Sequence, residues 1–396
     1  MRQRRTTYLH LAVAWLAALV SATALAQTQA QTQAQTQAQA QADTPPPVEA
    51  FFAAPDLGEA GLSPSGRHLA VLVPGQGGRN ALAVLDLTDT RQSRVLTRFN
   101  EADIRDLRWV DDDWLVFSVH DLQAGSGEHE LGLGLFSISR HGEGLRTLVK
   151  PRQTPYYVER PSGIDRRLEA NHQLLAIPRD GSREVIVGEI SRKDGARDKL
   201  APRRLNVETG RARRIEGLTP SQYWMFDSSG EARVAIDEDA GRLKVRWREP
   251  GSTAWTQLLD ADALTAAWVP HSLDTAGRLY VTDRRGDGGT RVLARYDFEK
   301  GAPAVEPTVV VPGFDFQGFL VADLDSAKSL GVRVLSDGET TVWLDPKLKA
   351  LQAEVDRTYV SQLERGVANP SLLILHRISV VLGVDLSVSL SRTSDA

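Results

Sequence analysis

Two acidic clusters carry residue types that bind metal ions. In Glu128-His129-Glu130, an extended backbone would place His129 on the opposite side from the two glutamates, which favours a solvated loop over a metal site. Asp111-Asp112-Asp113 lacks the spaced oxygen ligands and the glycine of a calcium loop, so we expect a turn between Trp109 and Trp114. The sequence therefore predicts no metal ligand and no cofactor.

One group of basic residues surrounds a predicted hairpin and has acidic residues nearby; its members are Arg203, Arg204, Arg211, Arg213 and Arg214. We expect a solvated hairpin here. A protein that binds polyanions generally needs a surplus of cations for the phosphates. This chain has instead a formal net charge of −4.

Serine peptidases and esterases of the α/β-hydrolase type raise their nucleophile on a tight turn with the pattern GxSxG, because only small flanking residues fit the strained backbone. This pattern does not occur in the 396 residues. Five of the histidines lie far apart without a shared spacing: His68, His120, His141, His172 and His271. We therefore predict that the chain has no catalytic residue and is not an enzyme.

The first 26 residues have the parts of a secretory signal peptide. Three arginines precede an apolar run over residues 9–20, and Ala24-Leu25-Ala26 forms a small-residue cleavage site before Gln27. The run is shorter than the roughly 20 residues that a spanning helix needs. We expect cleavage, export to the periplasm or the medium, and no membrane span in the mature chain.

Residues 27–47 repeat QTQA and QAQA and end in three prolines. Such a tract buries too little apolar surface to fold, so we expect a disordered linker. Loss of residues 1–26 removes three arginines and no acid, which lowers the net charge from −4 to −7. The chain has no cysteine, which suits an exported protein that avoids disulfide pairing.

Short strands and turns dominate residues 48–345, with no helix long enough for alternating strand and helix units. The predicted strands are Leu69–Val73, Ala81–Leu87, Trp114–Val119, Leu133–Ser139, Glu184–Ile190, Leu205–Val207, Ala232–Ile236, Leu243–Arg248, Leu279–Asp283, Val292–Asp297, Gly331–Leu335 and Thr340–Leu344. A sandwich, a barrel or a propeller would fit this pattern.

A weak internal repeat favours the propeller. Five segments share one plan, an apolar residue, an Asp or Ser turn, usually a glycine, and an alternating strand: residues 62–73, 109–119, 226–236, 272–282 and 322–334. Where two consecutive segments can both be identified, they lie about 40 to 50 residues apart, which is the spacing of four-stranded blades. The fold class predicted is mainly β, an incomplete propeller of four-stranded blades with a short α-helical tail.

Several phrases resemble the amino-terminal propeller of bacterial prolyl-oligopeptidase-family serine peptidases. They are VEAFFAAPDLGEAGLSPSGRHLAVLV, the turn Trp109-Val110-Asp111-Asp112, RLNVETGRARRI and WLDPKLKALQAEVDRTY, and the similarity covers about residues 48–357. In that family the propeller is a non-catalytic gate before an α/β-hydrolase domain. Only 39 residues follow Arg357, so we expect the hydrolase to be missing and the propeller to be incomplete.

The last part of the chain, residues 356–390, resembles the second half of a Cro/repressor-type helix-turn-helix domain. Asp356 is a candidate N-cap and Gly366 a helix end, whereas the next helix has the apolar stripe Leu372, Leu375, Ile378 and Leu382. By this resemblance Arg357, Thr358 and Gln362 occupy the positions that reach base edges, and Arg and Gln suit guanine and adenine. Residues 356–396 hold four arginines and four acids, which gives no cationic surplus.

The predicted organisation is a signal peptide (1–26), a linker (27–47), a propeller-like domain (48–345), a partial helix-turn-helix segment with a short helical start (346–390) and a disordered tail (391–396). We interpret the chain as the non-catalytic propeller remnant of an exported peptidase, joined by gene fusion or frame disruption to the partial helix-turn-helix. Two alternatives stay open. The tail could bind DNA, or the propeller could be a gating subunit for peptides that acts with a separately encoded hydrolase.

Overall fold

The computed structural model describes residues 58–121, 134–151, 164–191, 198–285, 289–323, 328–336 and 338–354. The chain divides into two compact units, Met1–Asp56 and Leu57–Ala396, and every described residue belongs to the second. The predicted signal peptide and linker, the Glu128-His129-Glu130 cluster and the residues from 355 onward therefore lie outside the described residues.

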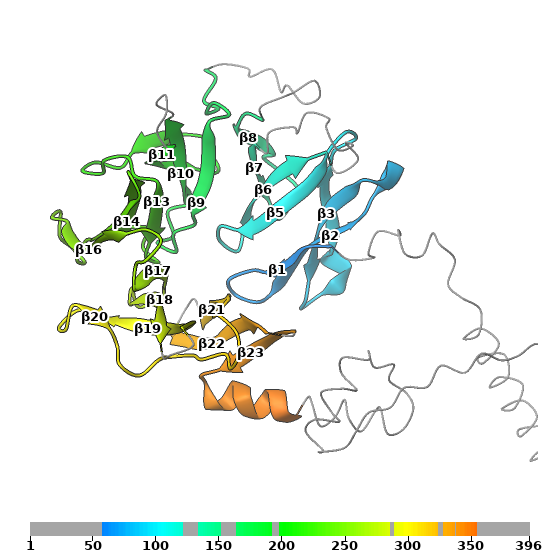
Figure 1. Ribbon diagram of the computed structural model, residues 1–396. Helices are drawn as coiled ribbons and strands as arrows, with labels where there is room; N and C mark the ends of the chain where they lie inside the picture. The colour runs from blue at the N-terminus through cyan, green and yellow to red at the C-terminus, as the bar shows by residue number, and fades with distance from the viewer. Residues whose placement is uncertain are drawn as a thin grey trace, which may run out of the picture. The chain divides into compact units, whose positions relative to one another are not determined.

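Six antiparallel sheets follow one another along the chain and form a β-propeller (Figure 1). Blade 1 contains β1 (Ala60–Leu62), β2 (His68–Pro74), β3 (Asn80–Asp86) and β4 (Arg94–Arg98). Blade 2 contains β5 (Asp103–Trp109), β6 (Trp114–His120), β7 (Leu135–Ser139) and β8 (Arg146–Val149). Blade 3 contains β9 (His172–Ala176), β10 (Glu184–Ser191), β11 (Lys199–Asn206) and β12 (Ala212–Arg214).

Blade 4 contains β13 (Tyr223–Phe226), β14 (Ala232–Asp239), β15 (Arg242–Trp247) and β16 (Thr256–Asp262). Blade 5 contains β17 (Trp268–Leu273), β18 (Leu279–Arg285), β19 (Thr290–Asp297) and β20 (Ala302–Pro303). Blade 6 has three strands in the described residues, β21 (Gly318–Asp323), β22 (Lys328–Leu335) and β23 (Glu339–Trp343). Two short 3-10 turns, η2 (Gln76–Gly78) and η3 (Thr90–Gln92), lie in blade 1.

The predicted fold class, mainly β with four-stranded propeller blades, is confirmed. Each of the twelve predicted strands overlaps the second or the third strand of a sheet. One of these predictions was displaced: residues 205–207 mark only the end of β11, which begins at Lys199. The early part of β11 was missed because Pro202, Arg203 and Arg204 interrupt its apolar pattern.

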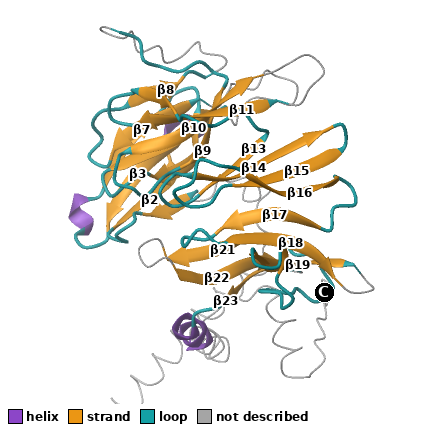
Figure 2. Ribbon diagram, turned by 90° about the vertical axis from the view of Figure 1, so that its left-hand side faces the viewer, coloured by secondary structure: helices purple, strands orange, loops and turns teal. Residues whose placement is uncertain are grey.

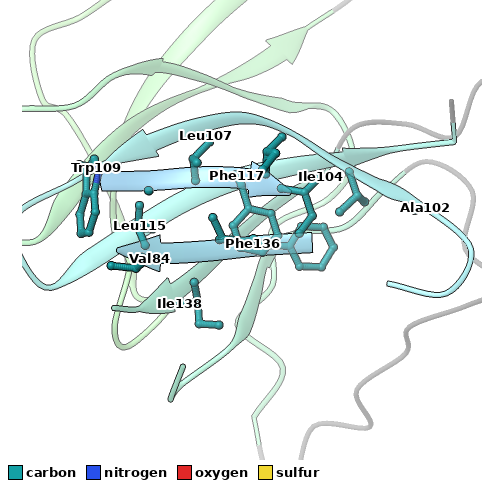
Figure 3. Close-up of a cluster of buried hydrophobic side chains, with 13 residues drawn as sticks. Val84, Ala102, Ile104, Leu107, Trp109, Leu115, Phe117, Phe136 and Ile138 are labelled. Atoms are coloured by element: carbon teal, nitrogen blue, oxygen red, sulfur yellow. The ribbon is translucent and has the colours of Figure 1, made fainter. Parts of the chain in front are cut away.

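Apolar side chains fill the spaces between neighbouring sheets. Buried clusters join blade 1 to blade 2, blade 2 to blade 3, blade 4 to blade 5, and blade 5 to blade 6. In the first cluster the rings of Phe117 and Phe136 stack with centroids 5.6 Å apart (Figure 3). Such packing between sheets is what holds successive blades together.

A short helix over residues 346–354 follows β23 (Figure 2). Asp345 caps it, because its Oδ1 accepts hydrogen bonds from the backbone N–H groups of Lys347 and Leu348 at 2.8 and 3.2 Å. Pro346 occupies the first helical position, where no intrahelical N–H is needed. Within the described ranges, no helix has the length and apolar character needed to cross a membrane.

Candidate functional site

The turns between the first and second strands of the blades make a series of polar contacts between neighbouring blades. At the start of this series, Asp112 in blade 2 accepts two hydrogen bonds from Ser65 in blade 1. The backbone N–H of Ser65 lies 3.0 Å and its hydroxyl 2.6 Å from Oδ1 of Asp112. Nearby, the indole N–H of Trp109 donates to the carbonyl of Gly61 at 2.8 Å. Blades 1 and 2 are thus joined by polar contacts as well as by their apolar cluster.

Arg183 joins the turn of blade 3 to the turn of blade 2. Its Nε lies 3.0 Å from Oδ2 of Asp111, and one terminal nitrogen lies 3.1 Å from Oδ2 of Asp113. The other terminal nitrogen lies 3.2 Å from Glu208 of its own blade. The backbone φ of Arg183 is 53°, a left-handed conformation that costs energy for a residue other than glycine. Three carboxylate partners offset this cost.

Arg204 makes the corresponding connection from blade 3 to blade 4. One guanidinium nitrogen lies 2.5 Å from Asp180, and another donates to the carbonyl of Ser229 at 2.8 Å. Gly230 is required beside this contact, because a Cβ at that position would lie 2.6 Å from Cγ of Pro178 and its φ is +79°.

Two weaker contacts continue the series through blades 5 and 6. The hydroxyl of Ser228 lies 3.3 Å from the carbonyl of Thr275 in blade 5. The hydroxyl of Ser329 in blade 6 lies 3.4 Å from Oδ2 of Asp274 in blade 5. We name the contacts from Ser65 to Ser329 the polar turn series; its side chains are Ser65, Asp111, Asp112, Asp113, Arg183, Arg204, Ser228, Asp274 and Ser329.

Three aspartates of these turns have a pKa below the ordinary value: Asp112, Asp180 and Asp227. Burial alone raises the pKa of Asp112, but the hydrogen bonds from Ser65 outweigh burial and leave the pKa below its ordinary value. Burial likewise opposes ionisation of Asp180, but hydrogen bonds from Ser182 and Arg204 lower its pKa. The same holds for Asp227, whose pKa is lowered by hydrogen bonds from Ser229 and Arg233. These carboxylates act as acceptors and not as proton donors near neutral pH.

Two histidines also lie between blades. Nε2 of His68 is 3.0 Å from a guanidinium nitrogen of Arg140 in blade 2 and 3.7 Å from Oδ2 of Asp86. Nε2 of His271 is 3.0 Å from the carbonyl of Gly318 in blade 6. Burial lowers the pKa of His271, so its imidazole is neutral at pH 7 and donates to that carbonyl.

The residues singled out from the sequence have different outcomes. Asp111-Asp112-Asp113 forms the expected turn, and each aspartate contacts a neighbouring blade or Arg140. The solvated hairpin is wrong for Arg204, whose side chain is 13% exposed and bridges two blades. Within the described residues, no group of three or more potential ligands is placed to hold a metal ion. Arg357, Thr358 and Gln362 lie outside the described residues and stay predictions.

Asp180-Gly181 is a turn signal before the predicted strand Glu184–Ile190, but sequence reasoning did not single out Arg183 or include this turn in the repeat. The signal was present, because residues 177–187 read IPRDGSREVIV, which is the plan of the other five segments. A search for Asp-Gly followed by an alternating strand would have found the sixth repeat. The partner of Arg183 in the neighbouring blade could not be found in this way, because no local pattern encodes it.

A family model described as helix-turn-helix matches residues 349–388. The match begins inside the helix at 346–354, which agrees with the partial Cro/repressor-type segment predicted from the sequence. It covers a small part of the chain. No curated protein sequence matches the chain.

Three solved structures show a similar arrangement of strands. The β-propeller domain of the Trilobed protease from Pyrococcus furiosus is 14% identical, with 74% of this chain and 86% of that chain covered and a TM-score of 0.38. Pyrococcus horikoshii acylaminoacyl peptidase is 12% identical, with 73% and 45% covered and a TM-score of 0.38. TolB from Acinetobacter baumannii is 14% identical, with 63% and 55% covered and a TM-score of 0.32.

The chain spans about half the length of that TolB and of the acylaminoacyl peptidases that it matches. All three TM-scores lie below 0.5, so the propeller assignment rests on the strand order of the six sheets and not on these matches.

Proposed function

We propose that the propeller is a non-catalytic module, the remnant of an exported peptidase-like protein, which binds peptide without cleaving it. The observation that supports this proposal is the polar turn series. The aspartates and arginines of these turns are the side chains best suited to contact a polar ligand or to take part in catalysis, and they are engaged in contacts between blades. Their geometry joins successive blades. The predicted signal peptide supports an exported location.

A direct test is to look for a reactive serine and for peptide hydrolysis. The purified chain is treated with a fluorophosphonate probe and assayed with prolyl and alanyl p-nitroanilides, with a known serine peptidase as positive control. We expect neither labelling nor turnover. Labelling of a serine that is lost on its substitution by alanine would overturn the non-catalytic assignment.

The same assay distinguishes the gating alternative. If a separately encoded hydrolase completes the protein, adding the candidate hydrolase produces turnover that depends on the propeller chain. A variant with Arg183→Ala and Arg204→Ala, which loosens the contacts between blades 2, 3 and 4, should then change the range of peptide sizes that are cleaved. Turnover that is the same with and without the propeller chain would argue against a gating role.

DNA binding through residues 349–388 is the second candidate, and the helix-turn-helix match is the observation that favours it. In the family pattern, Arg357, Thr358 and Gln362 would reach base edges in the major groove. The described start of the segment supports a helix, because Asp345 caps residues 346–354. An exported location would separate this segment from the chromosome, so the two candidates make different predictions about where the protein acts.

Fluorescence anisotropy with duplex DNA at increasing salt tests this candidate. We expect any binding to weaken about tenfold or more in the variant with Arg357→Ala and Gln362→Ala, because each base contact contributes about 1–3 kcal/mol. Arg392→Ala removes one positive charge outside the matched residues and serves as the control. Binding that survives the double substitution would refute the mapped recognition residues.

A further inference from the structure

Blade 6 packs against blade 5 with one of its two faces. The strand register places Leu320, Val332 and Val342 on one face of the sheet and Phe319, Arg333 and Thr341 on the other. Val332 and Val334 belong to the buried cluster that includes Leu293 of blade 5. The opposite face therefore points away from blade 5. We name it the outer face of blade 6; it contains Phe319, Gly331, Arg333, Leu335 and Trp343.

The outer face of blade 6 combines the polar residues Arg333, Glu339 and Thr341 with two exposed apolar side chains. Phe319 is 54% and Leu335 is 47% exposed. The guanidinium of Arg333 lies 6.0 Å from the centre of the Phe319 ring, a cation–π contact that keeps the aromatic ring in place without covering it. Neighbouring exposed apolar side chains of this size mark an interaction surface.

Trp343 lies on the same face as Phe319. Its ring lies across Gly331, since a Cβ added to Gly331 would approach Cε3 of Trp343 to 3.0 Å. The ring of Trp343 therefore lies close to the sheet beside the more exposed Phe319 and Leu335.

The chain itself supplies a tethered occupant. Leu344 and Asp345 directly follow β23, and the backbone N–H groups of both donate to the carbonyl of Leu330 in β22. The helix at 346–354 thus starts on blade 6. Residues 355–388 continue the helix-turn-helix match from this anchored point. Because this segment is tethered to blade 6, its effective concentration at the surface of blade 6 is in the roughly millimolar range.

The sequence of this segment contains more apolar surface than its own core needs. Besides the stripe described above, the same predicted helix carries four more apolar residues, Leu373, Ile374, Val380 and Val381. They would form two pairs about 100° apart around a helix, so they widen its apolar surface. A single stripe can pack within a small helical domain, whereas this second apolar set requires a partner surface.

We propose that the outer face of blade 6 binds residues 355–388 of the same chain, with Phe319 and Leu335 packed against the second apolar set. In this arrangement the propeller provides the helical segment with the partner surface that the segment lacks. The proposal concerns an intramolecular contact and does not depend on DNA binding or on the absence of catalysis.

Site-specific photo-crosslinking in the full chain tests the contact. The benzophenone amino acid p-benzoylphenylalanine replaces Phe319 in one variant and Tyr223 of blade 4 in the control; Tyr223 is 60% exposed and lies on the first strand of its sheet. We expect crosslinks from position 319 to residues 360–388 in at least about tenfold excess over position 223, as a tethered contact would give. Crosslinks confined to blade 1, or equal yields from both positions, would overturn the proposal.

Mixing isotopically labelled and unlabelled chains shows whether a crosslink forms within one chain or between two copies. Crosslinks between chains of different mass would also overturn the intramolecular contact.

A second measurement uses hydrogen–deuterium exchange of residues 360–388. Leu335→Lys should accelerate exchange there by about tenfold, whereas Leu264→Lys, at an exposed position outside blade 6, should not. Equal exchange in both variants would refute the docking surface.

Discussion

Blade 2 and blade 6 share the same antiparallel order of strands, but their faces are packed differently. Blade 2 contributes Phe117 to the cluster with blade 1 and Val116 to the cluster with blade 3. Blade 6 contributes Val332 to the cluster with blade 5, whereas Phe319 on its other face is exposed. The sequences reflect this difference. β6 is almost continuously apolar, and β22 alternates at Val332-Arg333-Val334.

The comparison teaches that two neighbours, and not strand pairing alone, make a blade rigid. The second and third strands pair antiparallel in both sheets, over Trp114–Phe117 of blade 2 and Gly331–Leu335 of blade 6, so their backbone pairing is alike. What differs is the apolar area removed from water on the second face. The following predictions test that difference, in order of decreasing effect.

Replacing a phenylalanine by alanine should lower the free energy of unfolding much more in blade 2 than in blade 6. Phe117 is fully buried and stacks on Phe136, so Phe117→Ala should lower the free energy of unfolding by about 3–5 kcal/mol. Phe319→Ala removes a half-exposed ring and should lower it by about 1 kcal/mol or less. Urea denaturation of both variants measures the difference. Equal losses would mean that both faces of blade 6 are packed.

A methyl group added under Trp343 should have an intermediate effect. In Gly331→Ala the new Cβ would lie 3.0 Å from both Cε3 of Trp343 and the carbonyl of Val342, so we expect a loss of about 1–3 kcal/mol and a shift in tryptophan fluorescence. Gly61→Ala in blade 1 is the matched control, because its nearest atom, Cδ1 of Trp109, would lie at 3.9 Å. An unchanged emission spectrum for Gly331→Ala would contradict the placement of the indole.

Removing an arginine should matter more between blades 2 and 3 than on blade 6. Arg183→Ala breaks contacts with Asp111, Asp113 and Glu208 and should cost about 1–2 kcal/mol at low salt, discounted for the exposure of these side chains. Arg333→Ala removes one exposed ion pair with Glu339 and should cost about 0.5 kcal/mol or less. The difference in free energy of unfolding between the two variants should be smaller at high salt than at low salt, which urea denaturation at both salt concentrations measures. A difference that is independent of salt would point to strain at Arg183 instead.

Acid should weaken the contact between blades 1 and 2, and this is the smallest expected effect. The folded pKa of Asp112 lies below its ordinary value of 3.8, so its contribution to stability is present above pH 3.8 and is lost as the pH falls through the folded pKa. The melting temperature of the wild type should therefore fall more steeply below pH 4 than that of Asp112→Asn. Ser65→Ala removes the hydroxyl donor but keeps the backbone N–H donor, so it should flatten the curve in part. Parallel curves for all three proteins would exclude this contact as a source of acid sensitivity.

Sequence reasoning located the second and third strands of the six sheets and missed the first and fourth. The located strands, such as β6 and β18, are buried and have apolar or alternating patterns. Several of the missed strands are short or exposed at a sheet edge, such as β12 with its sequence ARR and β20 with two residues. β5 is longer and partly buried, but charged residues interrupt its apolar pattern. An edge strand is defined by the strand beside it, so its own residues carry little signal.

The chain by itself determined the repeated turn, the central strands and the helical character that begins at residue 346. It also predicted that Asp111-Asp112-Asp113 forms a turn. Only the tertiary structure decided that Asp112 contacts Ser65, that Asp111 and Asp113 contact Arg183, and that one face of blade 6 stays exposed. The physical reason is the sequence separation of the residues in contact. Backbone turns and alternating burial follow from a few adjacent residues. Contacts between blades join residues about 70 positions apart and exist only once the blades have packed together.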